Sequence, residues 1–436
     1  MEQPELQPEI HPLTQWLLNR KPWQFTLWVG AMAFLVYACM YGLRRPYTVG
    51  EFQELSFLGM NYKSLLIISQ VCGYALSKFI GITVISEMGR PFRAITILFL
   101  TGIAQIVLVF FAIIPAPYNL FVMFFNGLPL GMIWGLVFSY LEGRRTTEVL
   151  GTMLSVSFIV SSGFVKSAGS MVLDVFGVSE FQMPWITGLI FYIPMIFLVW
   201  LLDKTPDPSP EDELLRTKRV PMDSAMRKKI FFQFAPGLIA LTLAYVFLTV
   251  FRDLRDNFAA EIFSSIGIGG NSMIFTWSEI PIAVTVFVIM ASLMLVKNNR
   301  KAFMINHIII ATGFLMVGLS TLALRMEMIS PLAWMILLGL GTYMGYLPFN
   351  SFLFDRLIAA FGSAANAGFF IYIADSFGYL GTVGTLFYQN FGAREFSWMD
   401  FLMDGSYALS MAGGAMIIFS LFYFNRKINK KESAEF

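Results

Sequence analysis

Two stretches 208 residues apart decide the fold of this chain, Tyr37-Ala-Cys-Met-Tyr-Gly-Leu-Arg44 and Tyr245-Val-Phe-Leu-Thr-Val-Phe-Arg252. Each ends a long apolar run, and each has six residues between a tyrosine and an arginine. The match continues in the next apolar run, where Ser69-Gln70 corresponds to Ser278-Glu279 at an offset of 209. Similarity at a nearly constant offset indicates a duplicated half-protein, with one arginine at the equivalent position of each half.

The composition predicts a membrane protein. Of the 436 residues, 57% are hydrophobic and only 13% are charged, which is more apolar surface than a soluble domain can bury. Cys39 and Cys72 both lie in apolar segments, so we expect buried thiols and not a disulfide. No metal-ligand cluster, Ser-His arrangement or nucleotide-binding glycine loop is evident. We therefore expect neither an enzyme nor a primary pump, with no cofactor, no metal and no nucleic-acid partner.

Apolar runs separated by charged residues predict twelve membrane spans. They are expected near 24–45, 62–86, 93–114, 119–141, 150–173, 184–202, 230–252, 272–296, 302–324, 331–353, 366–389 and 406–425. The polar stretch 203–229 contains four prolines and many charges, and this composition predicts a linker. The predicted organisation is an N-terminal segment 1–23, a first bundle 24–202, the linker 203–229, a second bundle 230–425 and a tail 426–436.

Basic residues predict the orientation. The N-terminus, the even-numbered loops and the tail hold 21 of the 30 lysines and arginines, whereas the other loops are short and almost uncharged. By the positive-inside rule both termini face the cytoplasm, as in a protein of the bacterial inner (plasma) membrane.

Two six-helix halves, a charged central linker and an internal repeat are together similar to the major facilitator superfamily. This resemblance implies an all-α integral membrane fold, with twelve transmembrane helices in two pseudo-symmetric six-helix bundles. The loop Glu87-Met-Gly-Arg90-Pro-Phe-Arg93 resembles a degenerate form of the inter-helix signature of that superfamily, and Lys297-Asn-Asn-Arg300-Lys301 is its mirror copy. We expect gating residues that hold helix ends together on the cytoplasmic side, and positive-inside charge alone is the alternative. The candidates are Glu87, Arg90, Arg93, Arg144 and Arg300.

Charged side chains inside apolar helices are costly and usually functional. Arg44 and Arg252 are the leading candidates for binding an anion, because the guanidinium group matches phosphate or carboxylate oxygens bidentately. A single arginine near a helix end could instead extend to the membrane surface, as could Arg45. Their recurrence in both halves favours a shared pocket. The predicted substrate-binding residues are Arg44, Arg252, Lys78, Tyr37, Tyr41, Tyr74, Gln70, Lys166 and Tyr346. Glu279 and Asp375 are the predicted coupling or counter-ion carboxylates.

Several of these stretches resemble the organophosphate:phosphate antiporter family. Tyr41-Gly-Leu-Arg44-Arg45-Pro-Tyr47 is similar to its first-helix motif, and Gly73-Tyr-Ala-Leu-Ser-Lys-Phe-Ile-Gly81 is similar to its second-helix stretch. Tyr245 to Arg252 resembles its seventh-helix segment, and Asp375-Ser-Phe-Gly-Tyr-Leu-Gly381 its eleventh-helix pattern.

The resemblance implies that Arg44 and Arg252 hold a substrate phosphate and that Lys78 corresponds to the second-helix lysine of that family. The chain departs from the pattern at Ser161, where bacterial members have a histidine, and at Pro46, where a polar residue is usual. It therefore resembles a divergent branch.

The predicted function is secondary active transport of a small organic anion, phosphorylated or carboxylated, by alternating access. Two alternatives remain open. One is proton-coupled transport of another small solute, with Glu279 or Asp375 titrating, and the other is a non-transporting membrane receptor that senses an anion. The expected partners are the small anionic solute and membrane lipid, and the protein is expected to act as a monomer.

Overall fold

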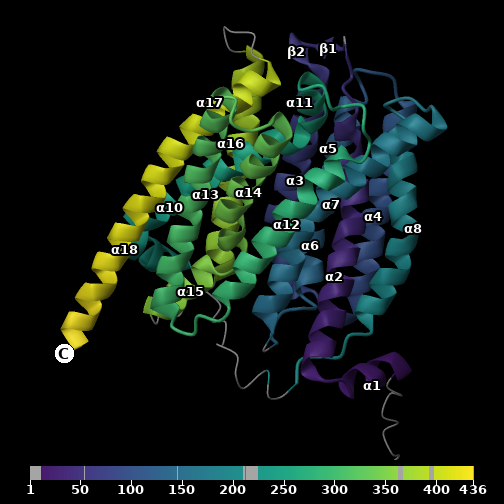
Figure 1. The fold of residues 1–436 in the computed structure, drawn as a ribbon. Helices are drawn as coiled ribbons and strands as arrows, with labels where there is room; N and C mark the ends of the chain where they lie inside the picture. The colour runs from purple at the N-terminus through teal and green to yellow at the C-terminus, as the bar shows by residue number, and fades with distance from the viewer. Residues whose placement is uncertain are drawn as a thin grey trace, which may run out of the picture.

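Long helices run nearly the full height of the molecule in the computed structural model of the chain (Figure 1). The structure describes residues 11–53, 55–144, 146–209, 212, 224–361, 367–391 and 397–435. Helix α1 and the end of α18 lie at one end, which we call the inner end. The opposite, outer end carries a short β-hairpin and α11.

The N-half runs from α1 to α8. Its helices are α1 Pro12–Leu18, α2 Pro22–Arg44, the 3-10 helix η1 Pro46–Val49, α3 Tyr62–Glu87, α4 Arg90–Ile113, α5 Leu120–Leu130, α6 Ile133–Phe138, α7 Thr147–Phe176 and α8 Met183–Asp203. The strands β1 Ser56–Phe57 and β2 Met60–Asn61 pair antiparallel.

The C-half runs from α10 to α18. Its helices are α10 Ser224–Asn257, α11 Ala259–Ser265, α12 Ile274–Leu293, α13 Asn299–Arg325, α14 Pro331–Ser351, α15 Leu353–Phe361, α16 Ala367–Phe391, α17 Trp398–Ala408, the π-helical turn η2 Leu409–Gly413 and α18 Gly414–Glu435.

Eleven helices in the described part of the chain are long and apolar enough to cross a membrane. Helix α16 occupies the remaining predicted position, and α17, η2 and α18 together form the last span. Large apolar side chains such as Phe99, Ile113 and Phe422 are more than 50% exposed, as expected where lipid covers the surface. The chain is an integral membrane protein, and the predicted fold class is confirmed.

The predicted fourth span is interrupted. Helix α5 ends at Leu130, and α6 begins at Ile133, because Pro129 has no backbone N–H to donate within the helix. Glycine allows this span to pack closely against α3, since a Cβ atom at Gly127 or Gly131 would overlap the carbonyl oxygen of Gln70 or Tyr74. This close packing fixes the position of two predicted site residues on α3.

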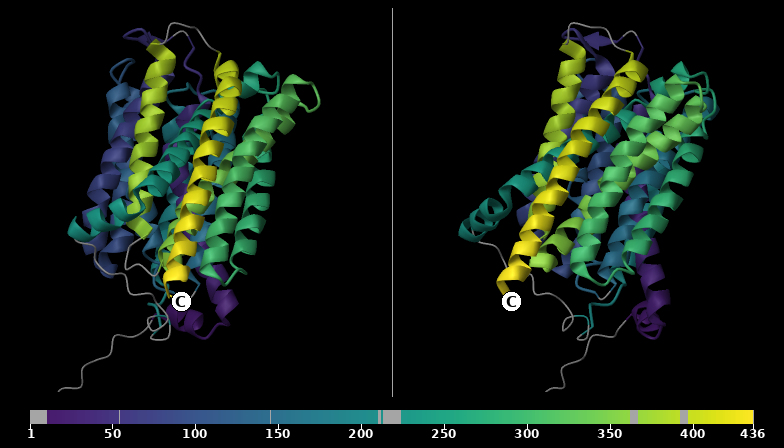
Figure 2. Two further views of the ribbon diagram at one scale, coloured as in Figure 1. Left: turned by 90° about the vertical axis from the view of Figure 1, so that its left-hand side faces the viewer. Right: turned by 60° about the vertical axis from the view of Figure 1, so that its left-hand side comes forward.

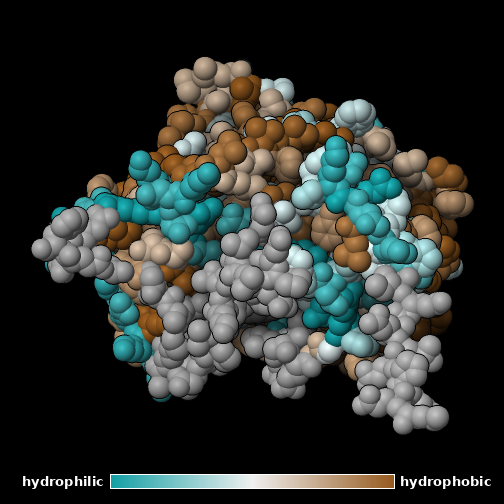
Figure 3. Space-filling model, turned by 90° about the horizontal axis from the view of Figure 1, so that it is seen from below, coloured by the Kyte–Doolittle hydropathy of each residue, from teal (hydrophilic) through white to brown (hydrophobic). Residues whose placement is uncertain are grey.

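The two halves meet along α7 and α12 and along α3 and α16 (Figures 1 and 2). Seen from the inner end, hydrophilic side chains form separate groups, and apolar side chains gather along the upper and right-hand rim (Figure 3). This pattern is typical of a membrane protein seen along the bilayer normal.

The cysteine prediction is half correct. Cys39 is buried and free, as expected, but the free thiol of Cys72 is exposed. Both lie in apolar helices, and hydropathy does not distinguish the side of a helix that faces lipid from the side that faces protein.

Candidate functional site

The end of α2 places Arg44 deep in the bundle. The helix stops at Arg44, and η1 follows directly, because Pro46 cannot continue the α-helical hydrogen-bond pattern. The carbonyl oxygen of Arg44 accepts a hydrogen bond of 3.0 Å from Nε2 of Gln70. Gln70 is eight residues into α3, or about 12 Å from its outer end at 1.5 Å per residue. Arg44 therefore lies inside the bundle and not at the outer end of α3, and only 4% of it is exposed.

The guanidinium of Arg44 rests on an aromatic ring. Its Cζ atom lies 3.8 Å from the centre of the Tyr74 ring, which is a cation–π distance. No carboxylate of the described residues forms an ion pair with Arg44, and its buried Nε atom has no hydrogen-bond partner there. A buried cation without a counter-ion is unfavourable, so this position is suited to an external anion.

Arg252 has a similar but not identical environment in the C-half. Its Cζ atom lies 4.2 Å from the centre of the Tyr346 ring on α14. Unlike Arg44, Arg252 forms an ion pair with a carboxylate, through an Nη2–Oδ1 distance of 2.7 Å to Asp253. Asp253 also accepts a 3.0 Å hydrogen bond from Thr382. The duplicated arginines thus both stack on tyrosine, but only one is neutralised.

Lys78 and Asp375 connect the halves on the inner side of Arg44. The Lys78 ammonium forms an ion pair with Oδ2 of Asp375, so α3 is joined to α16. Oδ1 of Asp375 accepts a hydrogen bond from the Tyr245 hydroxyl. The rings of Tyr74 and Tyr379 pack beside this pair with centroids 5.4 Å apart. The structure therefore brings Asp375 together with Tyr74 and Lys78 of α3, which lie far from it in the sequence.

A denser network joins the halves on the outer side of the arginines. Asp256 on α10 accepts from Arg45 at 3.0 Å, from Ser162 at 2.5 Å and from the Lys166 ammonium. Arg45 also donates to Asn257. The alternative that Arg45 extends to the membrane surface is wrong, because the residue is 4% exposed and paired with the C-half. Lys166 likewise contacts a carboxylate of the opposite half.

Glu279 is already paired. Its Oε1 lies 2.7 Å from Nη1 of Arg255, whose Nη2 also donates to the carbonyl of Met335 at 3.1 Å. The second carboxylate oxygen of Glu279, Oε2, is buried without a hydrogen-bond partner among the described residues. Arg255 and Glu279 occupy the positions that correspond to Tyr47 and Gln70 in the N-half. There the Tyr47 hydroxyl donates to Oε1 of Gln70 at 3.2 Å. Both residues of the Arg255–Glu279 pair thus follow the repeat, at offsets of 208 and 209.

The remaining predicted tyrosines pack beside Arg44 on α2. Tyr37 and Tyr41 are 2% and 6% exposed, and their ring centroids are 5.5 Å apart. In the C-half the rings of Tyr245 and Tyr346 are stacked with centroids 5.1 Å apart. The described site is therefore lined by phenol rings, which offer both ring surface and hydroxyl groups to a ligand.

The charges of the site do not balance. Six cationic side chains lie there, largely buried, beside four carboxylates, all among the described residues. The cations are Arg44, Arg45, Arg252, Arg255, Lys78 and Lys166, and the carboxylates are Asp253, Asp256, Glu279 and Asp375. The excess of positive charge favours an anionic ligand.

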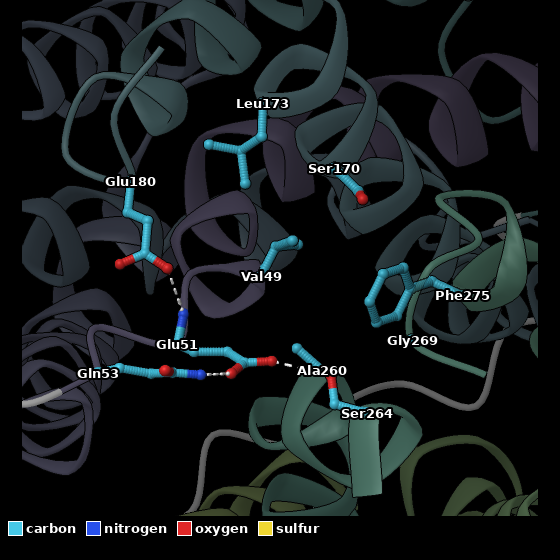
Figure 4. A pocket seen from close by; sticks show the side chains of 10 residues that line it. All are labelled: Val49, Glu51, Gln53, Ser170, Leu173, Glu180, Ala260, Ser264, Gly269 and Phe275. Atoms are coloured by element: carbon cyan, nitrogen blue, oxygen red, sulfur yellow. Dashed lines mark hydrogen bonds between the residues drawn. The ribbon is translucent and has the colours of Figure 1, made fainter. Parts of the chain in front are cut away.

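A cavity of about 450 Å³ opens between the halves at the outer end (Figure 4). Glu51 and Glu180 point into it from the N-half, and Ser264 from α11 donates to Oε1 of Glu51 at 2.9 Å. Arg44 and Arg252 do not line this cavity. We call this cavity the outer vestibule.

Lys63 and Glu261 form a second link near this vestibule. The Nζ–Oε1 distance is 2.6 Å, and Lys63 is completely buried. Burial raises the pKa of the Glu261 carboxyl, and the ammonium of Lys63 opposes that rise. Sequence reasoning missed both residues, because a lone charge near the end of an apolar run reads as a membrane-surface residue. The contribution of Asp256 as a common acceptor was missed for the same reason.

The predicted gating arginines form contacts within their own half. Arg90 pairs with Asp207, and Arg144 donates to the carbonyl of Pro206. Arg93 donates to the carbonyl of Ser139 at 3.0 Å, and Arg300 donates to Asn429. The side chain of Glu87 lies outside the described residues. These arginines contact helix ends, the start of the linker and α18, and their gating role stays a prediction.

Solved structures of membrane transporters share this fold. Similar structures include the nucleoside transporter NupG (D323A mutant), with a TM-score of 0.58 and 15% identity over 90% of this chain and 99% of that one. A D-xylose-proton symporter has a TM-score of 0.56 and 14% identity over 92% of this chain and 97% of that one. A bacterial homologue of the human drug peptide transporters PepT1 and PepT2 has a TM-score of 0.61 and 13% identity over 92% of this chain and 99% of that one. At these identities the likeness establishes the major facilitator fold alone.

No curated protein sequence matches the chain significantly. Residues 46–427 match a family profile described as "Family of unknown function (DUF5690)". This match includes η1, every later helix up to most of α18, and all of the site except Arg44, Arg45 and the α2 tyrosines. The chain therefore belongs to the DUF5690 family.

Proposed function

We propose that this protein is a secondary transporter of a small organic anion, and that Arg44 and Arg252 bind the anionic group. The observation that carries the proposal is the environment of Arg44, a buried guanidinium on the Tyr74 ring with no carboxylate partner among the described residues. An anion at this point would supply the missing counter-charge and accept hydrogen bonds from the guanidinium fork.

The position of the site supports transport. Arg44 lies on the N-half and Arg252 on the C-half, near mid-depth of α3 and between two layers of contacts that join the halves. The outer layer contains the Asp256 network, and the inner layer contains the Lys78–Asp375 pair. A ligand between the layers could be exposed to either side of the membrane by breaking one layer at a time, which is alternating access.

Among the described residues, the contacts between the halves are concentrated toward the outer end. Besides the Asp256 network they include Lys63 with Glu261, Ser264 with Glu51 and Thr276 with Ser167. At the inner end, Arg356 pairs with Glu148 at 3.2 Å. The described conformation is accordingly closed on its outer side, and opening it requires the loss of several buried ionic contacts.

Exchange of an organic phosphate for inorganic phosphate is the finer form of this proposal. Asp375 then serves as the counter-ion of Lys78 and is displaced when an anion arrives. The stacked tyrosines of both halves would contact the organic part of the substrate. The resemblance of the second-helix stretch to organophosphate:phosphate antiporters supports this form, and Ser161 replaces the histidine that bacterial members carry.

Proton coupling is a second candidate, and one observation favours it. The second carboxylate oxygen of Glu279 is buried without a hydrogen-bond partner among the described residues, so it could accept a proton.

In the proposed orientation both termini face the cytoplasm of a bacterial cell and the vestibule opens to the outside. The inner end is then the cytoplasmic end.

Transport in proteoliposomes distinguishes the two candidates. Uptake of labelled inorganic phosphate is measured with phosphate, an organic phosphate or neither inside, and with or without a pH gradient. Exchange predicts uptake that requires an internal anion and is unaffected by the gradient in wild type and in Glu279→Gln. Uptake that follows the gradient in wild type and loses this response in Glu279→Gln would establish proton coupling instead.

A further inference from the structure

The inner end of the C-half carries an unusual concentration of positive charge. The segments 224–235, 297–303 and 422–431 contain ten lysines and arginines and no aspartate or glutamate. They form the start of α10, the start of α13 and the lower part of α18. We call this surface the C-half basic patch.

Side-chain contacts bring these three helix ends together. Lys427 on α18 donates to the carbonyl of Gln233 on α10, and its Nζ lies 4.8 Å from the centre of the Phe234 ring. Arg300 on α13 donates to Asn429 on α18. These contacts place the ends of α10, α13 and α18 beside one another at the inner end of the C-half.

Most of the patch has no internal counter-ion. The side chains of Lys228, Lys229, Lys297, Lys301, Arg426 and Lys430 are exposed, and none forms an ion pair with a carboxylate of the described residues. The N-half differs at the same end, where Arg90 pairs with Asp207 and Lys204 lies 3.6 Å from Asp203. The charge of the C-half patch is thus available to an external partner.

The patch lies at the border of the lipid-facing surface. Phe232 on α10 is 73% exposed three residues after Lys229, and Phe422 on α18 is 63% exposed four residues before Arg426. Leu295 is 82% exposed and precedes Lys297 by two residues. In each segment the exposed apolar side chain lies closer to the middle of the bundle and the basic side chain lies closer to the inner end. A phospholipid has the same arrangement, with its acyl chains toward the membrane centre and its phosphate at the surface.

We propose that the C-half basic patch binds the headgroups of anionic phospholipids of the inner leaflet, with acyl chains against Phe232 and Phe422. The phosphate groups accept hydrogen bonds from the exposed lysines and from Arg426, and they supply the counter-charge that the protein lacks. Helix α10 begins at Ser224, within the predicted linker, so bound lipid fixes the start of the C-half at the membrane surface.

The test uses the whole chain purified in an uncharged detergent. Fluorescent phosphatidylglycerol is titrated against it, and a phosphatidylcholine analogue with the same acyl chains is the reference. We expect tighter binding of phosphatidylglycerol and a loss of that preference in Lys228→Gln/Lys229→Gln/Arg426→Gln/Lys430→Gln. Each basic residue near a membrane surface changes affinity about fivefold, so loss of all four should weaken binding by roughly several hundredfold if their effects add.

Two controls keep the outcome decisive. Lys228→Arg/Lys229→Arg/Lys430→Arg retains the charge and should retain the preference, and Arg20→Gln/Lys21→Gln removes two charges from the N-half and should also retain it. Glycerol phosphate, which has the anion but no acyl chain, should compete weakly.

Equal affinity of wild type for the two lipids would overturn the proposal, as would an unchanged preference in the glutamine variant. If that variant does not fold, loss of the wild-type preference in high salt supports the proposal, and a salt-independent preference overturns it.

Discussion

The guanidinium of Arg44 lies over the ring of Tyr74, with Cζ 3.8 Å from the ring centre, and this contact joins α2 to α3 near the middle of the bundle. The tyrosine face supplies partial negative charge to a cation that has no carboxylate partner among the described residues. The stack holds the guanidinium in place and leaves its donors available, and this is the geometry from which the proposed anion site follows.

Replacing Arg44 by lysine should weaken anion binding even though the charge is retained. The ammonium cannot make two parallel hydrogen bonds to phosphate or carboxylate oxygens, and hydrogen bonds to charged groups contribute about 1.5 to 3 kcal/mol each. We expect an affinity roughly ten- to a hundredfold lower in a thermal-shift titration with the best anionic ligand. Arg325→Lys is the matched control, because Arg325 pairs with Asp404 at an exposed position. Equal affinities of Arg44→Lys and wild type would exclude bidentate recognition by Arg44.

Tyr74 should separate the contribution of the ring from that of the hydroxyl. Tyr74→Phe keeps the aromatic face, so ligand affinity and melting temperature should change little. Tyr74→Ala removes the aromatic face and leaves the Arg44 guanidinium unsupported. This should weaken ligand binding by about 2 kcal/mol, because a cation–π contact is strongest when the cation is desolvated. Titration of both variants with the same anion checks this expectation. A Phe variant as defective as the Ala variant would show that the hydroxyl, and not the ring, is important.

Replacing one partner of the Lys78–Asp375 pair should destabilise the protein more than replacing both partners. Asp375→Asn leaves a largely buried ammonium without its counter-ion, and loss of one partner of a buried pair typically costs about 3 kcal/mol or more. Lys78→Met/Asp375→Asn should recover part of the lost melting temperature. The double-mutant cycle measures this coupling, and additive effects would show that the two residues do not interact in the folded protein.

The pH dependence of stability should include a contribution from Glu261 on α11. Burial raises the pKa of this carboxyl above its ordinary value of 4.5, so the folded state holds the proton more tightly than the unfolded state. The resulting stabilisation is fully present below pH 4.5 and is lost as pH rises through the raised pKa. Glu261→Gln should therefore flatten the fall of melting temperature with increasing pH, and Glu327→Gln, at an exposed position, is the comparison. An unchanged slope in Glu261→Gln would mean that Lys63 fully offsets the burial of the carboxyl.

The fold was predictable because hydropathy and the repeat act over long segments. The predicted third span, 93–114, corresponds to α4 Arg90–Ile113, and 184–202 corresponds to α8 Met183–Asp203. The break near Pro129 was not predicted, because a proline in an apolar run is common in membrane helices that other helices support. The exposed Cys72 shows a related limit, since apolar composition does not reveal which side of a helix faces lipid.

The candidate site was predictable in its residue types but not in its pairings. The offset of 208 identified Arg44 and Arg252 as equivalent, and both are buried beside a tyrosine. The offset does not reveal that, of these two arginines, Arg252 alone pairs with Asp253, or that Arg45 crosses to Asp253 and Asp256 in the other half. These contacts depend on how the halves dock, and no local pattern records that arrangement.

Ligand binding by the purified protein tests the central claim most directly. Melting temperatures are measured with phosphorylated sugars, glycerol phosphate, inorganic phosphate and dicarboxylates, and with neutral sugars and nucleosides at the same ionic strength. Wild type, Arg44→Gln and Arg325→Gln are compared side by side. We predict that at least one anion raises the melting temperature of wild type and Arg325→Gln but not of Arg44→Gln. Stabilisation of wild type by a neutral solute and by no anion would contradict the account.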